Sequence, residues 1–226
     1  MLIIDKYAYT NRLRSTNPML KTYIGLTLLI LAILTETFYI HIVIILTMAS
    51  TVTVIARIPI KNYIKILFLP LTFAALSVIA ILISFSKDDI SYLWGFSISN
   101  IKVFITIESL RAARILFFRA FAALSSTLFI VLTTPMEQLI YVLKKHKIPR
   151  IFIEMSILIY RFIFIFLKES KEIYYAQELR FGYINLRNSY KSLSSLIVAL
   201  FTRIMIRYEE METALISKNF DKEFYL

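Results

Sequence analysis

The sequence contains no cysteine, and it has few of the other residues that usually build reactive sites. Its 226 residues include only three glycines and two histidines, His41 and His146. Without cysteine the chain forms no disulfide framework and no thiolate metal site. It also lacks a glycine-rich loop ending in Gly-Lys-Ser or Gly-Lys-Thr, the pattern that binds nucleotide phosphates. We therefore expect no catalytic residue, no metal site and no cofactor, and any ATP-driven step would need a partner that binds the nucleotide.

Acidic residues are scarce as well, since 15 Asp and Glu stand against 26 Lys and Arg, for a net charge of +11. The acids are scattered along the chain, which disfavours a membrane enzyme acting on lipid or isoprenoid substrates. By contrast, 58% of the residues are hydrophobic, compared with about 45–50% in an ordinary soluble domain. The basic residues flank the apolar runs, so they indicate anchoring at the cytoplasmic face of a membrane and not nucleic-acid binding.

Four apolar runs predict a transmembrane domain over residues 1–132. Each run is close to the roughly 20 residues that cross a bilayer core. The basic residues fall on alternate sides, which predicts a multi-pass protein of the cell membrane with a cytoplasmic N-terminus. The expected spans cover residues 22–35, 38–56, 66–85 and the second half of a helix over 101–132, with a cytoplasmic loop at 57–65 and an outer connection at 86–102.

Residues 133–226 have a different pattern and predict a cytoplasmic-side domain. A one-sided helix is expected over 133–150, followed by long amphipathic helices over 151–180 and 192–218. Basic residues flank 151–167 at both ends, so a crossing there would leave one basic cluster outside the cell. A membrane-spanning hairpin is the alternative. The fold class predicted is an all-α, polytopic membrane helical protein with about four to six membrane helices plus long cytoplasmic helices.

Three charged residues, Arg119, Arg161 and Glu154, are expected to have structural roles within or beside the membrane. Charged groups in a bilayer are costly and usually face the interior of the helix bundle or water. Glu154 and Arg161 are seven residues apart, so they fall on one polar stripe of their helix. A charged residue at a helix end can simply lie outside the hydrocarbon, in water. Arg119 lies too far along its helix for this explanation, so we expect it to hold the helix bundle together.

The two long helices of the second domain end in similar short sequences. In each, an alanine is followed four residues later by a basic residue, Arg180 in the first helix and Lys218 in the second. A cation is favourable at a helix C-terminus because of the helix dipole, and Gly182 or Asn219 would cap the helix. The alternative is that the two basic ends are aimed at an acidic groove on a soluble partner.

Several short segments, spread along most of the chain, match the motifs of one membrane protein family. They are Asp5-Lys6-Tyr7-Ala8-Tyr9-Thr10-Asn11-Arg12-Leu13 with Asn17-Pro18 and Lys21, Ile58-Pro59, Pro70-Leu71-Thr72-Phe73, Thr133-Thr134-Pro135 with Leu139, Leu143 and Ile148-Pro149, and Tyr160-Arg161-Phe162 with Glu169. In these segments the chain resembles the transmembrane T component of energy-coupling factor transporters, in the cobalt-uptake branch (the CbiQ/EcfT family).

The resemblance implies a non-catalytic subunit that transmits the motions of two ABC-type ATPase subunits to a substrate-binding membrane subunit of the cobalt- or nickel-binding type. In this family the metal is bound by the partner, and the assembly sits in the cell membrane of a prokaryote. The alternative for this chain is a self-sufficient channel or secondary carrier for a small ion or solute, which would work without an ATPase.

The resemblance also implies which residues contact the ATPases. Family members end their two long coupling helices with Ala-Arg-Gly-like motifs, whose arginines dock into grooves on the two ATPase subunits. The motifs align here as Leu179-Arg180-Phe181 and Ser217-Lys218-Asn219. The second motif departs from the pattern, because lysine offers a point charge where arginine offers a planar fork of donors.

Overall fold

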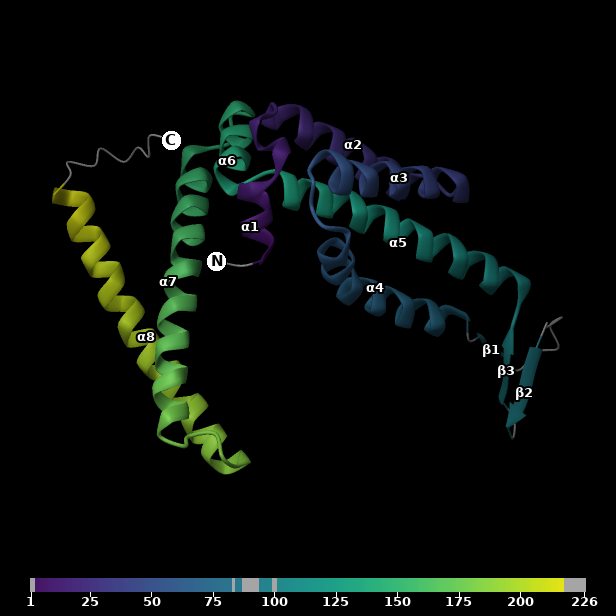
Figure 1. Ribbon diagram of the computed structural model, residues 1–226. Helices are drawn as coiled ribbons and strands as arrows, with labels where there is room; N and C mark the ends of the chain where they lie inside the picture. The colour runs from purple at the N-terminus through teal and green to yellow at the C-terminus, as the bar shows by residue number, and fades with distance from the viewer. Residues whose placement is uncertain (1–2, 83, 87–93, 99–100, 218–226) are drawn as a thin grey trace. The chain divides into compact units, whose positions relative to one another are not determined.

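The computed structural model describes residues 3–82, 84–86, 94–98 and 101–217 (Figure 1). These residues are almost wholly helical, which confirms the predicted all-α class, and they include one small antiparallel sheet that was not predicted. The chain forms two compact units, Met1–Val142 and Leu143–Leu226.

The first unit is built around one long helix, α5 (Ile107–Thr133), against which the other long helices of this unit pack (Figure 1). The buried core lies along this helix and includes Phe129 and Leu132, together with Ala32, Ile44 and Val52 from the preceding helices. The remaining helical elements of this part of the chain are α1 (Ile3–Thr10), η1 (Arg12–Ser15), α2 (Pro18–Leu34), α3 (Phe38–Ser50), η2 (Thr51–Ile55), α4 (Ile60–Leu82) and α6 (Met136–Lys145).

The start of α5 corrects the predicted helix boundary at residue 101. Residues Ile101–Ile105 form strand β3, which lies between β1 (Ser84–Ser86) and β2 (Trp94–Ile98) in the small sheet. The helix begins later because Thr106 and Ser109 form a capping box, in which each side chain accepts a 3.1 Å hydrogen bond from the other residue's backbone N–H. Residues 87–93 and 99–100 of the predicted outer connection lie outside the described residues.

Four helical segments in the described part of the chain are long and apolar enough to cross a membrane: Phe38–Ile55, α4, α5 and α8 (Leu186–Ser217). The predicted first span corresponds to α2, an apolar helix of 17 residues. On α4, large apolar side chains such as Phe68 and Leu69 are 64% and 78% exposed, as expected for a surface that contacts lipid or another membrane subunit.

The second unit consists mainly of two long helices, α7 (Arg150–Leu179) and α8, which cross and contact each other (Figure 1). The prediction placed the second helix at 192–218, so α8 starts six residues earlier than expected. An 18-residue stretch of α8 is apolar enough to give this helix the composition of a candidate span. By length and composition α8 qualifies as a candidate membrane span, which the predicted alternative of a membrane-spanning hairpin requires of this helix.

Candidate functional site

The C-terminus of α7 carries the first of the two basic motifs and ends in a Schellman turn. The backbone N–H of Phe181 donates to the carbonyl of Glu178 at 2.9 Å, and that of Gly182 donates to Gln177 at 2.9 Å. Phe181 has a φ of 59°, the left-handed conformation that glycine adopts most readily. The expectation that Gly182 caps this helix was therefore wrong, because Phe181 occupies the left-handed position and Gly182 follows it.

This turn leaves the three motif residues exposed on the second unit. Leu179 is 83% exposed and Phe181 is 72% exposed, and Arg180 between them is exposed as well. Arg180 is also the C-cap residue, so its cation lies where the dipole of α7 favours positive charge. The result is an exposed cation flanked in the sequence by two exposed apolar residues, on a backbone of defined conformation, which is suited to docking.

A hydrogen-bond network that the sequence did not predict fixes the turn between α7 and α8. The side-chain amide of Gln177 donates to the carbonyl of Ser192 (2.9 Å), and the Ser192 hydroxyl donates to the carbonyl of Gly182 (2.8 Å). The Tyr183 hydroxyl donates to Gln177 Oε1 at 2.7 Å. Burial raises the pKa of Tyr183 above its ordinary value. No motif or periodic pattern in the sequence indicates these pairings.

Further along the pair, a nearly buried carboxylate joins α7 to α8. Glu169 is only 4% exposed, and it accepts 3.0 Å hydrogen bonds from Arg203 Nη1 at Oε2 and from Arg207 Nε at Oε1. These two hydrogen bonds hold the pKa of Glu169 below its usual value. In the sequence, Glu169 stands out only as part of a family motif. The one available signal was the spacing of Arg203 and Arg207, four residues apart and so on one face of a helix.

The second basic motif is described only at its first residue. Ser217 ends α8, is exposed, and donates a 2.8 Å hydrogen bond to the carbonyl of Thr213 one turn earlier. Lys218 and Asn219 lie outside the described residues. The structure thus brings Leu179, Arg180 and Phe181 together in one turn, and their proposed counterpart on α8 remains a prediction from the sequence.

Arg119 lies on α5 and contacts the connection between α2 and α3. Its Nη2 donates to the carbonyl of Thr35 at 3.2 Å and lies 3.8 Å from Glu36 Oε1. The Arg119 side chain is 29% exposed, and that of Glu36 is 84% exposed. The Thr35 carbonyl lies just after the C-terminus of α2, where carbonyls lack helical partners.

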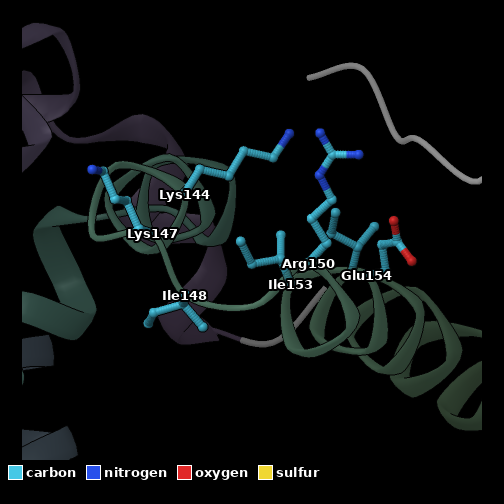
Figure 2. Close-up of a pocket in the computed structure, with 7 residues that line it drawn as sticks. Lys144, Lys147, Ile148, Arg150, Ile153 and Glu154 are labelled. Atoms are coloured by element: carbon cyan, nitrogen blue, oxygen red, sulfur yellow. The ribbon is translucent and has the colours of Figure 1, made fainter.

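The other two charged residues for which structural roles were predicted, Glu154 and Arg161, lie on α7. Arg161 is exposed, and Glu154 is half-buried at a cavity of about 380 Å³ that is also lined by Lys144 and Arg150. Figure 2 shows Lys144 and Arg150 extending toward the same space, with Glu154 beside Arg150 and Lys147 pointing away. No cluster of three or more potential metal ligands occurs among the described residues.

The chain is similar over almost its whole length to proteins of cobalt transport. Residues 10–226 match a family model described as CbiQ, cobalt transport protein. The chain is 35% identical over 223 residues to the cobalt transport protein CbiQ of Salmonella typhimurium, with 99% of both chains covered. A protein of the same name from Rhodobacter capsulatus is 29% identical over 220 residues, which cover 97% of this chain and 85% of the relative. The putative fused cobalt transport protein CbiMQ of Methanocorpusculum labreanum is 32% identical over 219 residues, or 97% of this chain and 36% of the relative.

Proposed function

The chain belongs to the CbiQ family of cobalt transport proteins, and we propose that within this family it is the non-catalytic coupling subunit of an ATP-driven uptake transporter. It is a multi-pass membrane protein of that family. The proposed cargo is cobalt, with nickel as the chemically related alternative. The metal is bound by a separate membrane subunit, and this chain transmits to that subunit the motions of two ABC-type ATPases.

The fused relative supports the proposed membrane partner. Its name joins CbiM and CbiQ, and this chain covers only 36% of its length. The remaining length leaves room for a second protein in the same polypeptide. Fusion holds two parts at a high effective concentration, which is useful when they act together. We therefore propose a CbiM-type, substrate-binding subunit as the partner of this chain.

The exposed turn at the end of α7 is the observation that carries the coupling role. Arg180 is exposed there and is flanked in the sequence by two exposed apolar residues, and the sequence has no phosphate-binding loop of its own. We propose that the first motif, Leu179-Arg180-Phe181, docks on one ATPase. The second motif, Ser217-Lys218-Asn219, docks on the other.

The same proposal orients the chain in the membrane. Residues 1–132 form the transmembrane domain, and residues 133–226 form the cytoplasmic-side coupling domain of a prokaryotic cell-membrane protein with a cytoplasmic N-terminus. The basic residues between the apolar runs support this orientation. Arg203 and Arg207 on α8 donate hydrogen bonds to Glu169 on α7. This pairing supports the placement of α8 against α7, because the charged side chains on that face of α8 have their partner within the protein.

A detergent pull-down of the tagged chain from its native cells, with mass spectrometry of the retained proteins, tests the proposal. We expect a paired ATPase and a small multi-span subunit to be retained. Arg180→Glu and Lys218→Glu should reduce ATPase recovery roughly tenfold or more, because a like charge facing an acidic groove is strongly unfavourable. Lys171→Glu is the matched control, since Lys171 is an exposed cation elsewhere on α7.

The outcomes separate the two functional classes. Loss of the ATPases in both motif variants, with the membrane subunit retained and the control unchanged, would support coupling. Recovery of the chain alone, in a detergent that keeps other ATP-driven transporters whole, would favour the channel or carrier. Lys218→Arg adds a graded test, because a planar fork should bind a carboxylate more tightly than a point charge and so raise ATPase retention.

A further inference from the structure

The N-terminal arm, defined here as residues 3–21, ends at the start of α2 in a lysine whose ammonium group is enclosed by protein. Lys21 is only 4% exposed. Its Nζ donates to the carbonyl of Leu13 at 3.0 Å, to the carbonyl of Thr133 at 2.9 Å and to Gln138 Oε1 at 2.7 Å. These three acceptors match the three hydrogens of a charged lysine.

The three acceptors come from three different elements of the first unit. Leu13 belongs to η1, Thr133 is the last residue of α5, and Gln138 lies in the first turn of α6. The Thr133 carbonyl lies at the C-terminal end of α5, where the helix dipole is negative and carbonyls lack helical partners. Lys21 therefore joins the N-terminal arm to both helices that meet at the α5–α6 corner.

Two further hydrogen bonds connect the same elements. Gln138 Nε2 donates to the carbonyl of Arg14 at 2.7 Å, so the Gln138 amide accepts from Lys21 and donates to the arm at once. Asn11 Nδ2 donates to the carbonyl of Leu132 at 3.1 Å. The arm thus contacts the end of α5 through two carbonyls and the start of α6 through one side chain.

The corner itself is short, and its backbone hydrogen bonds stay close to the chain: the N–H of Thr134 donates to the carbonyl of Ile130 at 3.0 Å, and those of Gln138 and Leu139 donate to the carbonyl of Pro135 at 3.0 and 3.1 Å. Only Thr134 and Pro135 separate α5 from α6, and Thr134 is extended, with φ −119° and ψ 102°. Hinges in proteins are a few residues at element ends that absorb changes in φ and ψ. Thr134 and Pro135 form a connection of this length between two helix ends, and both residues are buried.

We infer that Lys21 and Gln138 are positioning residues that hold the α5–α6 corner at one angle. This inference rests on the proposed coupling function. A displacement of α6 then moves α5, a candidate membrane span, instead of being absorbed by rotation at Thr134 and Pro135. Burying an ammonium group is costly, and its directional hydrogen bonds to two helix ends are what set the angle.

The first test measures the corner directly and needs no partner protein. Because the chain has no cysteine, Leu110→Cys on α5 and Tyr141→Cys on α6 introduce two unique labelling sites, each 51% exposed. Electron paramagnetic resonance between spin labels at these sites should give one narrow distance distribution. Lys21→Met should broaden the distribution and shift its mean, whereas the exposed-site control Lys6→Met should leave it unchanged. An unchanged distribution in Lys21→Met would overturn the inference.

The second test asks whether the corner angle matters for coupling. The complex with its ATPases and substrate-binding subunit is reconstituted in liposomes, and cobalt uptake is measured against ATP hydrolysis. Lys21→Met and Gln138→Leu should lower uptake per ATP roughly tenfold, the scale of one lost charge-assisted hydrogen bond. Gln138→Glu keeps an acceptor for Lys21 but loses the donor to the Arg14 carbonyl, so it should give a ratio between those of the unaltered protein and Gln138→Leu.

The ratio separates positioning from stability, because a variant that is merely unstable loses complex without changing uptake per ATP. An unchanged ratio in both Lys21→Met and Gln138→Leu would overturn the inference and leave the coupling function intact. If the unaltered complex drives no ATP-dependent uptake, the proposed function fails instead, and the spin-label measurement still decides whether Lys21 fixes the corner. Gln138 is half-buried, so its variants provide a second route if Lys21→Met does not fold.

Discussion

Glu169 of α7 and Arg203 of α8 are joined by a 3.0 Å hydrogen bond between a carboxylate that is nearly buried and a guanidinium that is half-exposed. Arg207, one turn further along α8, occupies the second oxygen of the same carboxylate. The two helices joined in this way are those that end in the two basic motifs. Their relative placement along the crossing is therefore set by an ion-pair cluster as well as by apolar packing.

Removing the negative charge of this cluster should loosen the helix pair. We expect Glu169→Gln to lower the free energy of unfolding by about 1–2 kcal/mol, since two charge-assisted hydrogen bonds to partly solvated arginines are weakened. Thermal unfolding of the purified protein in detergent measures this. Glu172→Gln is the control, because Glu172 is about half-exposed and lies 3.6 Å from Arg203. An equal loss in both variants would contradict a special role for Glu169.

The same carboxylate predicts a pH dependence with a defined sign. Hydrogen bonds from Arg203 and Arg207 hold the pKa of Glu169 below the ordinary value of 4.5. A group with a lowered folded-state pKa stabilises the fold above its unfolded pKa, and this stabilisation is lost as the pH falls through the folded pKa.

The difference in melting temperature between wild type and Glu169→Gln should therefore be constant above about pH 5 and shrink below it. Melting curves of both proteins, recorded in parallel across this range, measure the difference. A difference that stays constant to about pH 3 would show that the charge of Glu169 does not contribute in this way.

The left-handed conformation of Phe181 predicts a stabilising substitution. This conformation costs a non-glycine residue roughly 1–2 kcal/mol, and glycine loses about 0.5–1 kcal/mol more chain entropy on folding. Phe181→Gly should therefore raise the unfolding free energy by up to about 1.5 kcal/mol. Phe181→Ala removes the ring but keeps the strained backbone, so it should give no gain in the same melting assay. A gain of equal size in Phe181→Ala would assign the effect to the exposed ring instead.

Gly182 should not tolerate any side chain. A Cβ built at this position would lie 2.6 Å from Ser192 Oγ and 2.9 Å from the carbonyl oxygen of Gln177. Since the carbonyl is backbone and cannot rotate away, Gly182→Ala should destabilise the turn by about 1–3 kcal/mol. Adding Ser192→Ala should recover part of this loss, because it removes the nearer of the two atoms. A neutral Gly182→Ala in thermal unfolding would refute the close approach.

Several elements of the fold were predictable from local patterns in the chain. Apolar runs and amphipathic periodicity predicted the helices. The predicted ends of α7 lie within one residue of the observed ends, because the helix begins directly after Pro149 and ends directly before Arg180, both of which are visible in the sequence. The start of α5 was not predicted, since the capping box of Thr106 and Ser109 lies within a run that also reads as helical. The start of α8 was missed because Leu186 begins the helix before its apolar stripe does.

The sequence by itself determined the membrane class, the helical architecture, the family and the position of the first basic motif, since composition, periodicity and short motifs are local properties. Only the tertiary structure decided that Phe181 and not Gly182 takes the left-handed position. It alone paired Glu169 with Arg203, 34 residues away, and Lys21 with Thr133, 112 residues away. Such pairings depend on how the helices pack, because one apolar pattern is compatible with many registers between neighbouring helices. The buried polar groups select one of these registers, since they must find hydrogen-bond partners in the packed chain.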